Sequence, residues 1–386
     1  MNAFATALIR IPSAEEFSAA LTRLFPSAGV EIVGVDRFFT LAGGRLGARL
    51  KLCETASVPH RAGAFLYCAE GAKECEESRA LSDLGWSLLA YPNDARLPFL
   101  AHWEERGASV QSWRPGRRAV YRWQRGVDSE YVKVLRPADL GAMQKLFNQC
   151  GERLKSAGVV VPQEIEAASS SLIFPAARGV PLHDRIKTRT GLDLESLAQS
   201  LAGFRDRCRI LTYRPSCRAF AVEDELFVVQ KFLRLAARVE PRTAARVESA
   251  YRRLDSTAAR RERWSMLHRD LHDKQIFLDG ASVSFIDVDT LAMGPLALDP
   301  CNLAAHLILR ELQGWCASGK ALARQWLAAN ARHTVGRESL RFFLCTSLLR
   351  LCCVYLLRPL EVRVALAMLE HAEPLLASAD PEGFLP

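Results

Sequence analysis

The stretch LHRDLHDKQIFLDG (267–280) and the FIDVDT that follows it (285–290) decide how this sequence is interpreted. Histidine, aspartate, lysine and glutamine side chains crowd into the first segment, and the second adds two aspartates to a short apolar run. Core packing does not require such a density of polar groups, because charged side chains are rarely buried without partners. The two segments therefore predict chemistry on a charged ligand.

FIDVDT is interpreted as a strand, whose alternation places Asp287 and Asp289 on one face. Two carboxylates on the same face of a buried strand repel each other and are costly to desolvate without a cation. A divalent metal would relieve that cost, and hard oxygen ligands suit magnesium. The structural alternative is that one aspartate caps a following turn while the other is exposed.

Asp270 and Gln275 favour the metal interpretation. Asp270 precedes Gln275 by five positions and Asp287 by seventeen. Phosphoryl transfer requires a carboxylate that orients the attacking hydroxyl, and oxygen ligands for the metal on the phosphates. Asp270 supplies the first, and Gln275 and Asp287 supply the second.

Together, HRDLHDKQ, FIDVDT and ALDPCNLA resemble the aminoglycoside phosphotransferase and choline-kinase-like superfamily, whose members are related to protein kinases. The resemblance covers roughly residues 109–357, about two thirds of the chain. It implies ATP and Mg²⁺ as cofactors, with Asp270 as the catalytic aspartate. The implied metal ligands are Gln275, Asp287 and Asp289.

Some positions depart from the usual superfamily pattern, which is H-G-D-L-H-x-x-N followed by a hairpin and I-D-F/W-D/E. Arg269 replaces a small glycine, and Gln275 replaces asparagine, which lengthens the side chain by one carbon. Maltokinase-like members resemble this chain in using glutamine and in carrying an extra N-terminal subdomain. The resemblance also implies that Asp299 supports the catalytic loop and that His268 is an internal hydrogen-bonding residue.

The upstream segments carry the expected nucleotide contacts. Lys133, in the apolar YVKVL, resembles the strand lysine that pairs with nucleotide phosphates; an edge-strand lysine that blocks aggregation is the alternative. Gly116 and Arg117, in the turn of SWRPGRRAVYRW, would cover the phosphates, although a surface arginine is the ordinary interpretation of Arg117. Phe174 and Pro175 would form the floor of the adenine pocket.

The predicted fold class is α+β: a bilobal, protein-kinase-like fold with an extra N-terminal α/β subdomain. Residues 1–105 are assigned to the accessory subdomain. Residues 106–176 form the β-rich lobe with the nucleotide-binding sheet, in which the pattern after the Pro-Gly turn at 115–116 predicts the order strand, strand, helix, strand, strand. Residues 177–386 form the lobe with the catalytic loop and the acceptor site, where Asp279-Gly280 predicts a turn between two short strands. Helical periodicity dominates this lobe and predicts helices over 193–208, 223–253, 301–315, 320–332, 338–357 and 361–377.

Bulk composition restricts the partners. The net charge of +8 is spread along the chain without a long basic block, so we expect no nucleic-acid partner. The N-terminus lacks a signal-peptide pattern, and the apolar run 342–357 is interrupted by Arg350 and falls short of a membrane span. The eleven cysteines include no CxxC pair. We expect a cytoplasmic protein with no membrane partner, which binds a nucleotide and a small-molecule acceptor.

The sequence therefore predicts an ATP- and Mg²⁺-dependent phosphotransferase that acts on a hydroxyl of a small metabolite. A sugar or polyol is the preferred acceptor, and aminoglycosides or amino alcohols are the alternatives. The rival hypothesis is a nucleotide-binding pseudokinase or regulatory protein. It is favoured because the helix after Lys133 has no early glutamate: Gln144 stands where one is expected, and Glu152 comes too late.

Overall fold

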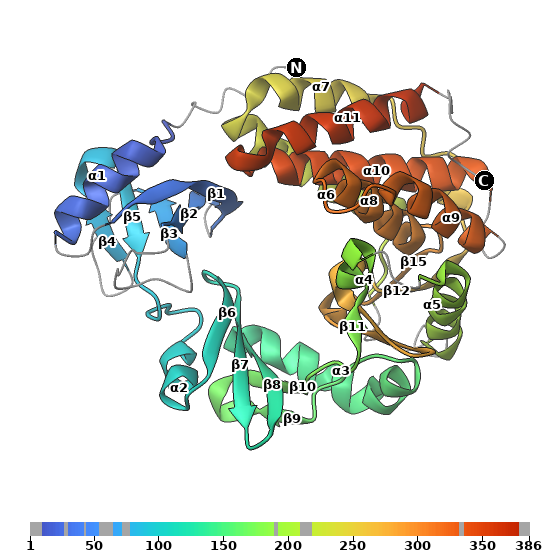
Figure 1. Cartoon of the computed structure of the whole chain (residues 1–386), viewed down its shortest axis with the longest axis horizontal. Helices are drawn as coiled ribbons and strands as arrows, with labels where there is room; N and C mark the ends of the chain where they lie inside the picture. Colours follow the sequence, from blue (N-terminus) through green and yellow to red (C-terminus); the bar gives the residue numbers. More distant parts are fainter. Residues whose placement is uncertain are drawn as a thin grey trace. The chain divides into compact units, whose positions relative to one another are not determined.

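The computed structural model divides the chain into two compact units, which we call the sheet unit and the helical unit (Figure 1). The sheet unit contains residues 1–145, 162–176 and 357–361, and the helical unit contains residues 146–161, 177–356 and 362–386. Within these bounds the structure describes residues 10–26, 30–41, 44–53, 65–71, 78–188, 192–208, 218–331 and 336–377. This β-rich N-terminal and helical C-terminal organisation confirms the predicted fold class.

The sheet unit begins with helix α1 (Ala14–Leu24) and a five-stranded sheet. Ser13 and Glu16 form a capping box at the start of α1, which satisfies backbone amides that the first turn leaves unpaired. The strands are antiparallel to their neighbours in the order β1-β2-β3-β5-β4. Their bounds are β1 (Ile32–Thr40), β2 (Leu46–Leu52), β3 (Phe65–Glu70), β4 (Ser78–Leu81) and β5 (Trp86–Leu89).

Helix α2 (Leu100–Glu105) leads into a second five-stranded sheet, with the order β6-β7-β8-β10-β9. The strands are β6 (Ser109–Arg114), β7 (Arg118–Arg125), β8 (Asp128–Leu135), β9 (Glu164–Glu166) and β10 (Ser171–Pro175). Helix α3 (Pro137–Ser156) lies between β8 and β9 in the chain, so the predicted order of strand, strand, helix, strand, strand is confirmed from β7 to β10. Strand β6 precedes them and was not predicted.

The two sheets of the sheet unit share one apolar core. Tyr67 and Tyr91 from the first 105 residues are buried in the same cluster as Trp113 and Tyr121 of the second sheet. The hydroxyl groups of Tyr91 and Tyr121 are 3.0 Å apart. We therefore propose that residues 1–105 form an accessory subdomain that depends on the kinase-like sheet for part of its core.

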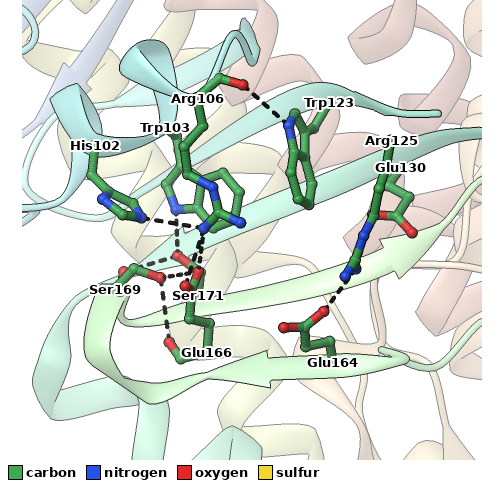
Figure 2. A network of polar contacts seen from close by, with 10 residues as sticks. All are labelled: His102, Trp103, Arg106, Trp123, Arg125, Glu130, Glu164, Glu166, Ser169 and Ser171. Atoms are coloured by element: carbon green, nitrogen blue, oxygen red, sulfur yellow. Dashed lines mark hydrogen bonds and ion pairs between the residues drawn. The ribbon is translucent and has the colours of Figure 1, made fainter.

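Arg106, directly after α2, fastens this helix to the second sheet (Figure 2). Its guanidinium carbon lies 4.3 Å from the ring centroid of Trp103 and 4.6 Å from that of Trp123. Its Nη1 donates to both carboxylate oxygens of Glu166 at 3.0 Å. The indole N–H of Trp103 donates to Ser171 Oγ at 2.8 Å, so the same contact region joins α2 to β7, β9 and β10.

The helical unit contains most of the remaining helices. The sequence pattern predicted one helix over 223–253, but the structure has two, because Pro241 has no amide hydrogen and begins a new helix. The helices are α4 (Leu182–Thr188), α5 (Leu194–Cys208), α6 (Val222–Val239), α7 (Pro241–Arg252), α8 (Leu298–Leu312), α9 (Gly319–Ala331), α10 (Arg337–Leu356) and α11 (Val362–Leu376).

Short strands hold the motif segments within the helical unit. A three-stranded sheet has the order β11-β13-β14, and a separate pair joins β12 to β15. Their bounds are β11 (Val180–Pro181), β12 (Trp264–Leu267), β13 (Ile276–Asp279), β14 (Ser282–Phe285) and β15 (Ala292–Pro295). The predicted turn at Asp279-Gly280 joins β13 to β14, with Gly280 at φ +57°.

The strand predicted over FIDVDT is wrong beyond Phe285. Strand β14 ends there, Asp287 has φ +62°, and Val288–Thr290 forms a short 3₁₀ turn. A left-handed backbone cannot continue the pleat, so side-chain alternation ends before the two aspartates.

Helix α10 contains the long apolar run. By length and composition alone, this helix could cross a membrane, contrary to the expectation from the interrupted run. In the structure, however, 83% of its most apolar window is buried within the protein, as in the core helix of a globular domain.

Replacing Arg106 by lysine should lower the free energy of unfolding by about 1–2 kcal/mol. Lysine keeps the charge but loses the planar guanidinium that contacts both indole rings and the paired hydrogen bonds to Glu166. Urea unfolding followed by circular dichroism measures the difference. Arg153→Lys is the control, because Arg153 is an exposed arginine on α3. Equal midpoints for the two variants would show that the stacked guanidinium does not stabilise the sheet unit.

Candidate functional site

The loop that follows β12 is held by a buried carboxylate. Asp299, on α8, is fully buried, and its two oxygens accept the backbone N–H groups of His268 and Arg269, each at 2.8 Å. The predicted supporting role of Asp299 is therefore confirmed. Arg269 has φ +70°, a conformation that favours glycine, which explains why a small residue is usual at this position in the resembled pattern.

His268 is an internal hydrogen-bonding residue, as predicted. Its ring Nε2 donates to the carbonyl oxygen of Ile286 at 2.8 Å, and its own carbonyl accepts from the hydroxyl of Thr290 at 2.9 Å. Its side chain is almost completely buried. These bonds join the loop before Asp270 to the segment around Asp287.

The β13–β14 hairpin brings Gln275 and Asp287 to the same end. Ile276 pairs with Phe285, and the N–H of Ile286 donates to the carbonyl of Gln275 at 3.0 Å. Gln275, immediately before β13, and Asp287, two residues after β14, therefore lie near the same end of the hairpin, although twelve positions separate them in the sequence.

The two polar atoms of the Gln275 side-chain amide have different surroundings. Its Nε2 donates to Asp270 Oδ2 at 3.4 Å. Its Oε1 is buried and has no hydrogen-bond partner among the described residues. A buried carbonyl oxygen without a donor costs free energy, and a cation or a donor supplied by a ligand would remove that cost.

Two glycines allow other segments to reach the hairpin. A Cβ on Gly158 would lie 2.7 Å from the carbonyl oxygen of Val283, and a Cβ on Gly179 would lie 2.3 Å from that of Leu278. Both glycines also have positive φ. Any larger side chain would push the backbone away from β14 or β13, so the hairpin carrying Gln275 and Asp287 is confined on both sides.

Sequence reasoning missed a buried ion pair within the motif. Asp273 is fully buried, and its carboxylate accepts two hydrogen bonds from Arg310 at 2.8 Å and bonds the ring of His183. Burial by itself would raise the pKa of Asp273, but the hydrogen bonds from His183 and Arg310 outweigh it and hold the pKa below its ordinary range. An arginine within the apolar LAAHLILREL was the available signal, because a buried arginine requires an acidic partner.

A second missed contact fixes the centre of the loop. The side-chain amide of Asn302 donates to the carbonyl of Leu271 at 3.0 Å, and its oxygen accepts from Arg350. Asn302 is fully buried. The residue next to Asp270 is thus held from α8, in the same way that Asp299 holds the residues before it.

His272 lies against α8 through a second histidine. Its ring centroid is 4.9 Å from that of His306, and its Nδ1 accepts the backbone N–H of Lys274 at 3.2 Å. Burial lowers the pKa of His272, and burial together with the neighbouring His272 lowers the pKa of His306 well below its ordinary value. Both pKa shifts favour the neutral form of the imidazole rings.

In the sheet unit, Lys133 and Phe174 lie on the same face of the second sheet. Lys133 of β8 pairs with Leu172, and Phe174 of β10 pairs with Tyr131. The ammonium nitrogen of Lys133 is 5.6 Å from the ring centroid of Phe174. Lys133 sits in the interior of the sheet with 8% exposure, so the edge-strand alternative does not apply.

The hairpin turn that was predicted to cover phosphates already binds a carboxylate. The backbone N–H of Gly116 donates to Asp94 Oδ2 at 2.7 Å, and the indole N–H of Trp113 donates to the same oxygen at 3.1 Å. Gly116 has φ +66°, and Arg117 is exposed. In this conformation the backbone N–H of Gly116 already donates to Asp94, so the same N–H cannot bind a nucleotide phosphate.

The metal-ligand prediction rests on Gln275 and Asp287. Among the residues that the structure describes, no three His, Cys, Asp or Glu side chains form a cluster typical of a protein-made metal centre. Magnesium fits this arrangement, because it commonly takes one or two protein oxygens and completes its shell with phosphates and water. Asp289 lies in the 3₁₀ turn rather than on a shared strand face, and its role as a ligand remains a prediction.

The sequence matches no protein-family model and no curated protein. The structure is similar to a thermostable mutant of aminoglycoside phosphotransferase APH(4)-Ia, with 17% identity and a TM-score of 0.50. The match covers 72% of this chain and 98% of that one. The chain has the aminoglycoside phosphotransferase fold.

Two other solved structures match with lower TM-scores. Choline kinase from Cryptosporidium parvum Iowa II is 10% identical at TM-score 0.47, over 75% of this chain and 95% of that one. Aminoglycoside phosphotransferase APH(3'')-Id from Streptomyces rimosus, in complex with ADP and streptomycin, is 19% identical at 0.46, over 65% and 95%. The likeness to maltokinase-like members remains a prediction.

Asp299→Asn should lower the free energy of unfolding by about 1–3 kcal/mol, because one of the two loop amides would then face an NH₂ donor in place of an oxygen. Chemical denaturation measures the loss. Asp279→Asn provides the matched control, since Asp279 is exposed in the turn between β13 and β14. If both substitutions had the same effect, the carboxylate of Asp299 would not be holding the loop.

Proposed function

We propose that the protein is an ATP- and Mg²⁺-dependent phosphotransferase whose acceptor is a hydroxyl group of a small metabolite. The observation that carries this proposal is the amide of Gln275. Its nitrogen end binds Asp270, and its oxygen end is buried without a hydrogen-bond partner in the described structure, at the end of the hairpin from which the chain continues to Asp287. One side chain therefore links the carboxylate proposed for the acceptor to the oxygen ligands proposed for the metal.

Asp270 would orient the acceptor hydroxyl. As that oxygen bonds to the γ-phosphorus, the bond from phosphorus to the bridging oxygen breaks, ADP leaves, and the hydroxyl proton passes to Asp270. Because the transition state needs little covalent help from the protein, fixed positioning of Asp270 is its main contribution. Asp270 is half-buried, with bonds from Asp299 and Asn302 holding the backbone on either side.

Gln275 and Asp287 would hold the magnesium ion, which when bound neutralises the phosphate charge of the nucleotide. Glutamine suits this position because its amide still reaches Asp270 while the oxygen remains available. Asp289 would be a further acidic group near the same end of the hairpin. The positive φ of Asp287 supports a functional role, since a strained backbone persists only where its surroundings hold it.

The second sheet would bind the nucleotide. Lys133 would pair with its phosphates, while Phe174 and Pro175 would line the adenine pocket. The support is the shared face of Lys133 and Phe174, with the ammonium group 5.6 Å from the ring. Gly116 and Arg117 would contact the phosphates only if the hydrogen bond between the Gly116 N–H and the carboxylate of Asp94 broke.

A sugar or polyol is the proposed acceptor, and the proposed compartment is the cytoplasm, where ATP is available. The solved structure that matches at a TM-score of 0.50 is named as an aminoglycoside phosphotransferase, which supports a hydroxyl acceptor by analogy of fold alone.

Nucleotide binding without turnover is the second candidate function. The contact between Asp94 and the Gly116 amide favours it, because a negative charge at that turn opposes the approach of phosphate.

Asp270→Asn should bind MgATP with near-normal affinity, whereas its turnover should fall by about two to four orders of magnitude, the range for loss of a positioned acid–base group. Asp287→Ala should lose magnesium-dependent nucleotide binding as well. Calorimetric MgATP titration and acceptor-dependent ADP release provide the two measurements. Asp206→Asn is the control, because Asp206 is exposed on α5. Binding by the wild type without turnover on any alcohol would favour the second candidate. Wild-type binding and turnover in both variants would refute the roles proposed for Asp270 and Asp287.

Gln275→Leu should raise the magnesium concentration needed for half-maximal nucleotide binding by about tenfold, because a carbon replaces the oxygen ligand. Gln275→Asn should retain a measurable response, since it keeps an amide oxygen on a shorter side chain. Nucleotide binding measured across a magnesium series tests both variants. An unchanged magnesium requirement in Gln275→Leu would exclude a ligand role for this side chain.

A further inference from the structure

Trp315, in the connection between α8 and α9, is surrounded by basic side chains from separate elements. The ammonium nitrogen of Lys187, on α4, lies 4.6 Å from its ring centroid, and that of Lys274 lies 5.4 Å away. The guanidinium carbon of Arg310, on α8, is at 4.9 Å. The ring of His183 packs edge-on at 4.8 Å. We call these residues the Trp315 cluster.

Three side chains of the Trp315 cluster carry positive charge, and the buried carboxylate of Asp273 lies next to one of them. Asp273 bonds Arg310 and His183, so it offsets the guanidinium. Lys187 and Lys274 add two further positive charges at the same indole ring. An aromatic face attracts each cation, but the cations repel one another, and this repulsion falls when an anion binds among them.

The cluster is attached to the proposed catalytic loop. Lys274 follows Asp270 by four positions, and its backbone N–H is bonded to the ring of His272. Asp273, between them, is bonded through its carboxylate to His183 and Arg310, which also contact the indole. Because these two bonds of Asp273 are buried, they hold the loop that carries Asp270 next to His183 and Arg310 within the helical unit.

The basic residues of the cluster come from elements that are far apart in the sequence. Lys187 is exposed near the end of α4, whereas Lys274 comes from the 3₁₀ turn Asp273–Gln275 and Arg310 from the buried face of α8. Their convergence on Trp315 is therefore a result of tertiary folding and not of a basic stretch in the sequence.

We propose that the Trp315 cluster binds a negatively charged group, a carboxylate or a phosphate, carried by the acceptor alcohol. This proposal rests on the function proposed above and specifies its substrate class. Cationic alcohols would be repelled by Lys187 and Lys274, and neutral sugars would gain nothing from them. An anionic sugar or polyol would place its charge at the cluster while its hydroxyl group reaches Asp270.

The first experiment measures anion binding without turnover. Inorganic phosphate is titrated by calorimetry in the presence of saturating MgADP, which fills the nucleotide site. Lys187→Gln should weaken phosphate binding about tenfold, and Lys187→Arg should restore most of it. Lys231→Gln is the matched control, since Lys231 is also an exposed lysine on a helix of the same unit. No phosphate binding by the wild type, or equal affinities in all variants, would overturn the proposal.

The second experiment compares alcohols on one hydroxyl framework. Glucose 6-phosphate, glucuronate, glucose and glucosamine are offered with MgATP, and ADP release is measured. The two anions should give the highest kcat/KM, and Lys187→Gln should raise KM for them about tenfold without changing kcat to the same extent. A preference between the two anions identifies phosphate or carboxylate as the recognised group.

The outcomes distinguish this inference from the proposed function. Faster turnover of glucosamine or glucose than of both anions would overturn the anionic acceptor and leave the phosphotransferase intact. Loss of phosphate binding in Lys187→Gln, together with no MgATP binding by the wild type, would support the anion site and refute the phosphotransferase.

Discussion

The carboxylate of Asp299 is the interaction on which the proposed site depends. It accepts two successive backbone N–H groups, those of His268 and Arg269, at the point where β12 ends. Two hydrogen bonds to one buried anion fix the direction of the chain and hold Arg269 in a left-handed conformation. The position of Asp270, the next residue, follows from this constraint.

The rest of the loop is held by buried polar groups of α8. Asn302 binds the backbone at Leu271, and Arg310 binds the side chain of Asp273. Buried ion pairs contribute little net stability, but removing one partner leaves an unpaired charge and is strongly destabilising. We interpret this network as a means of specifying one loop conformation, because each of its bonds ends on the loop that carries Asp270.

A further buried pair lies behind Asn302. Arg350 of α10 donates to Asn302 and lies 3.6 Å from Glu225 of α6, measured between Nε and Oε1. Burial raises the pKa of Glu225 despite the opposing charge of Arg350. The interruption of the apolar run by Arg350 thus has a structural explanation: this arginine connects Asn302, which holds the proposed catalytic loop, to Glu225 in the helical core.

The sequence by itself determined the fold class, most helix positions and the spacing of Asp270, Gln275 and Asp287. These depend on local periodicity and on a motif contained in a short segment, so they can be read along the chain. The strand predicted over FIDVDT failed because hydropathy alternation does not report the left-handed backbone of Asp287.

Only the tertiary structure decided which distant groups meet. Asp94 reaches the amide of Gly116, Arg310 reaches Asp273, and Lys187 reaches Trp315. In each case the partners come from different elements, and their approach depends on how those elements pack. A one-dimensional pattern shows that a buried arginine needs a partner, but the choice of partner requires the packed core.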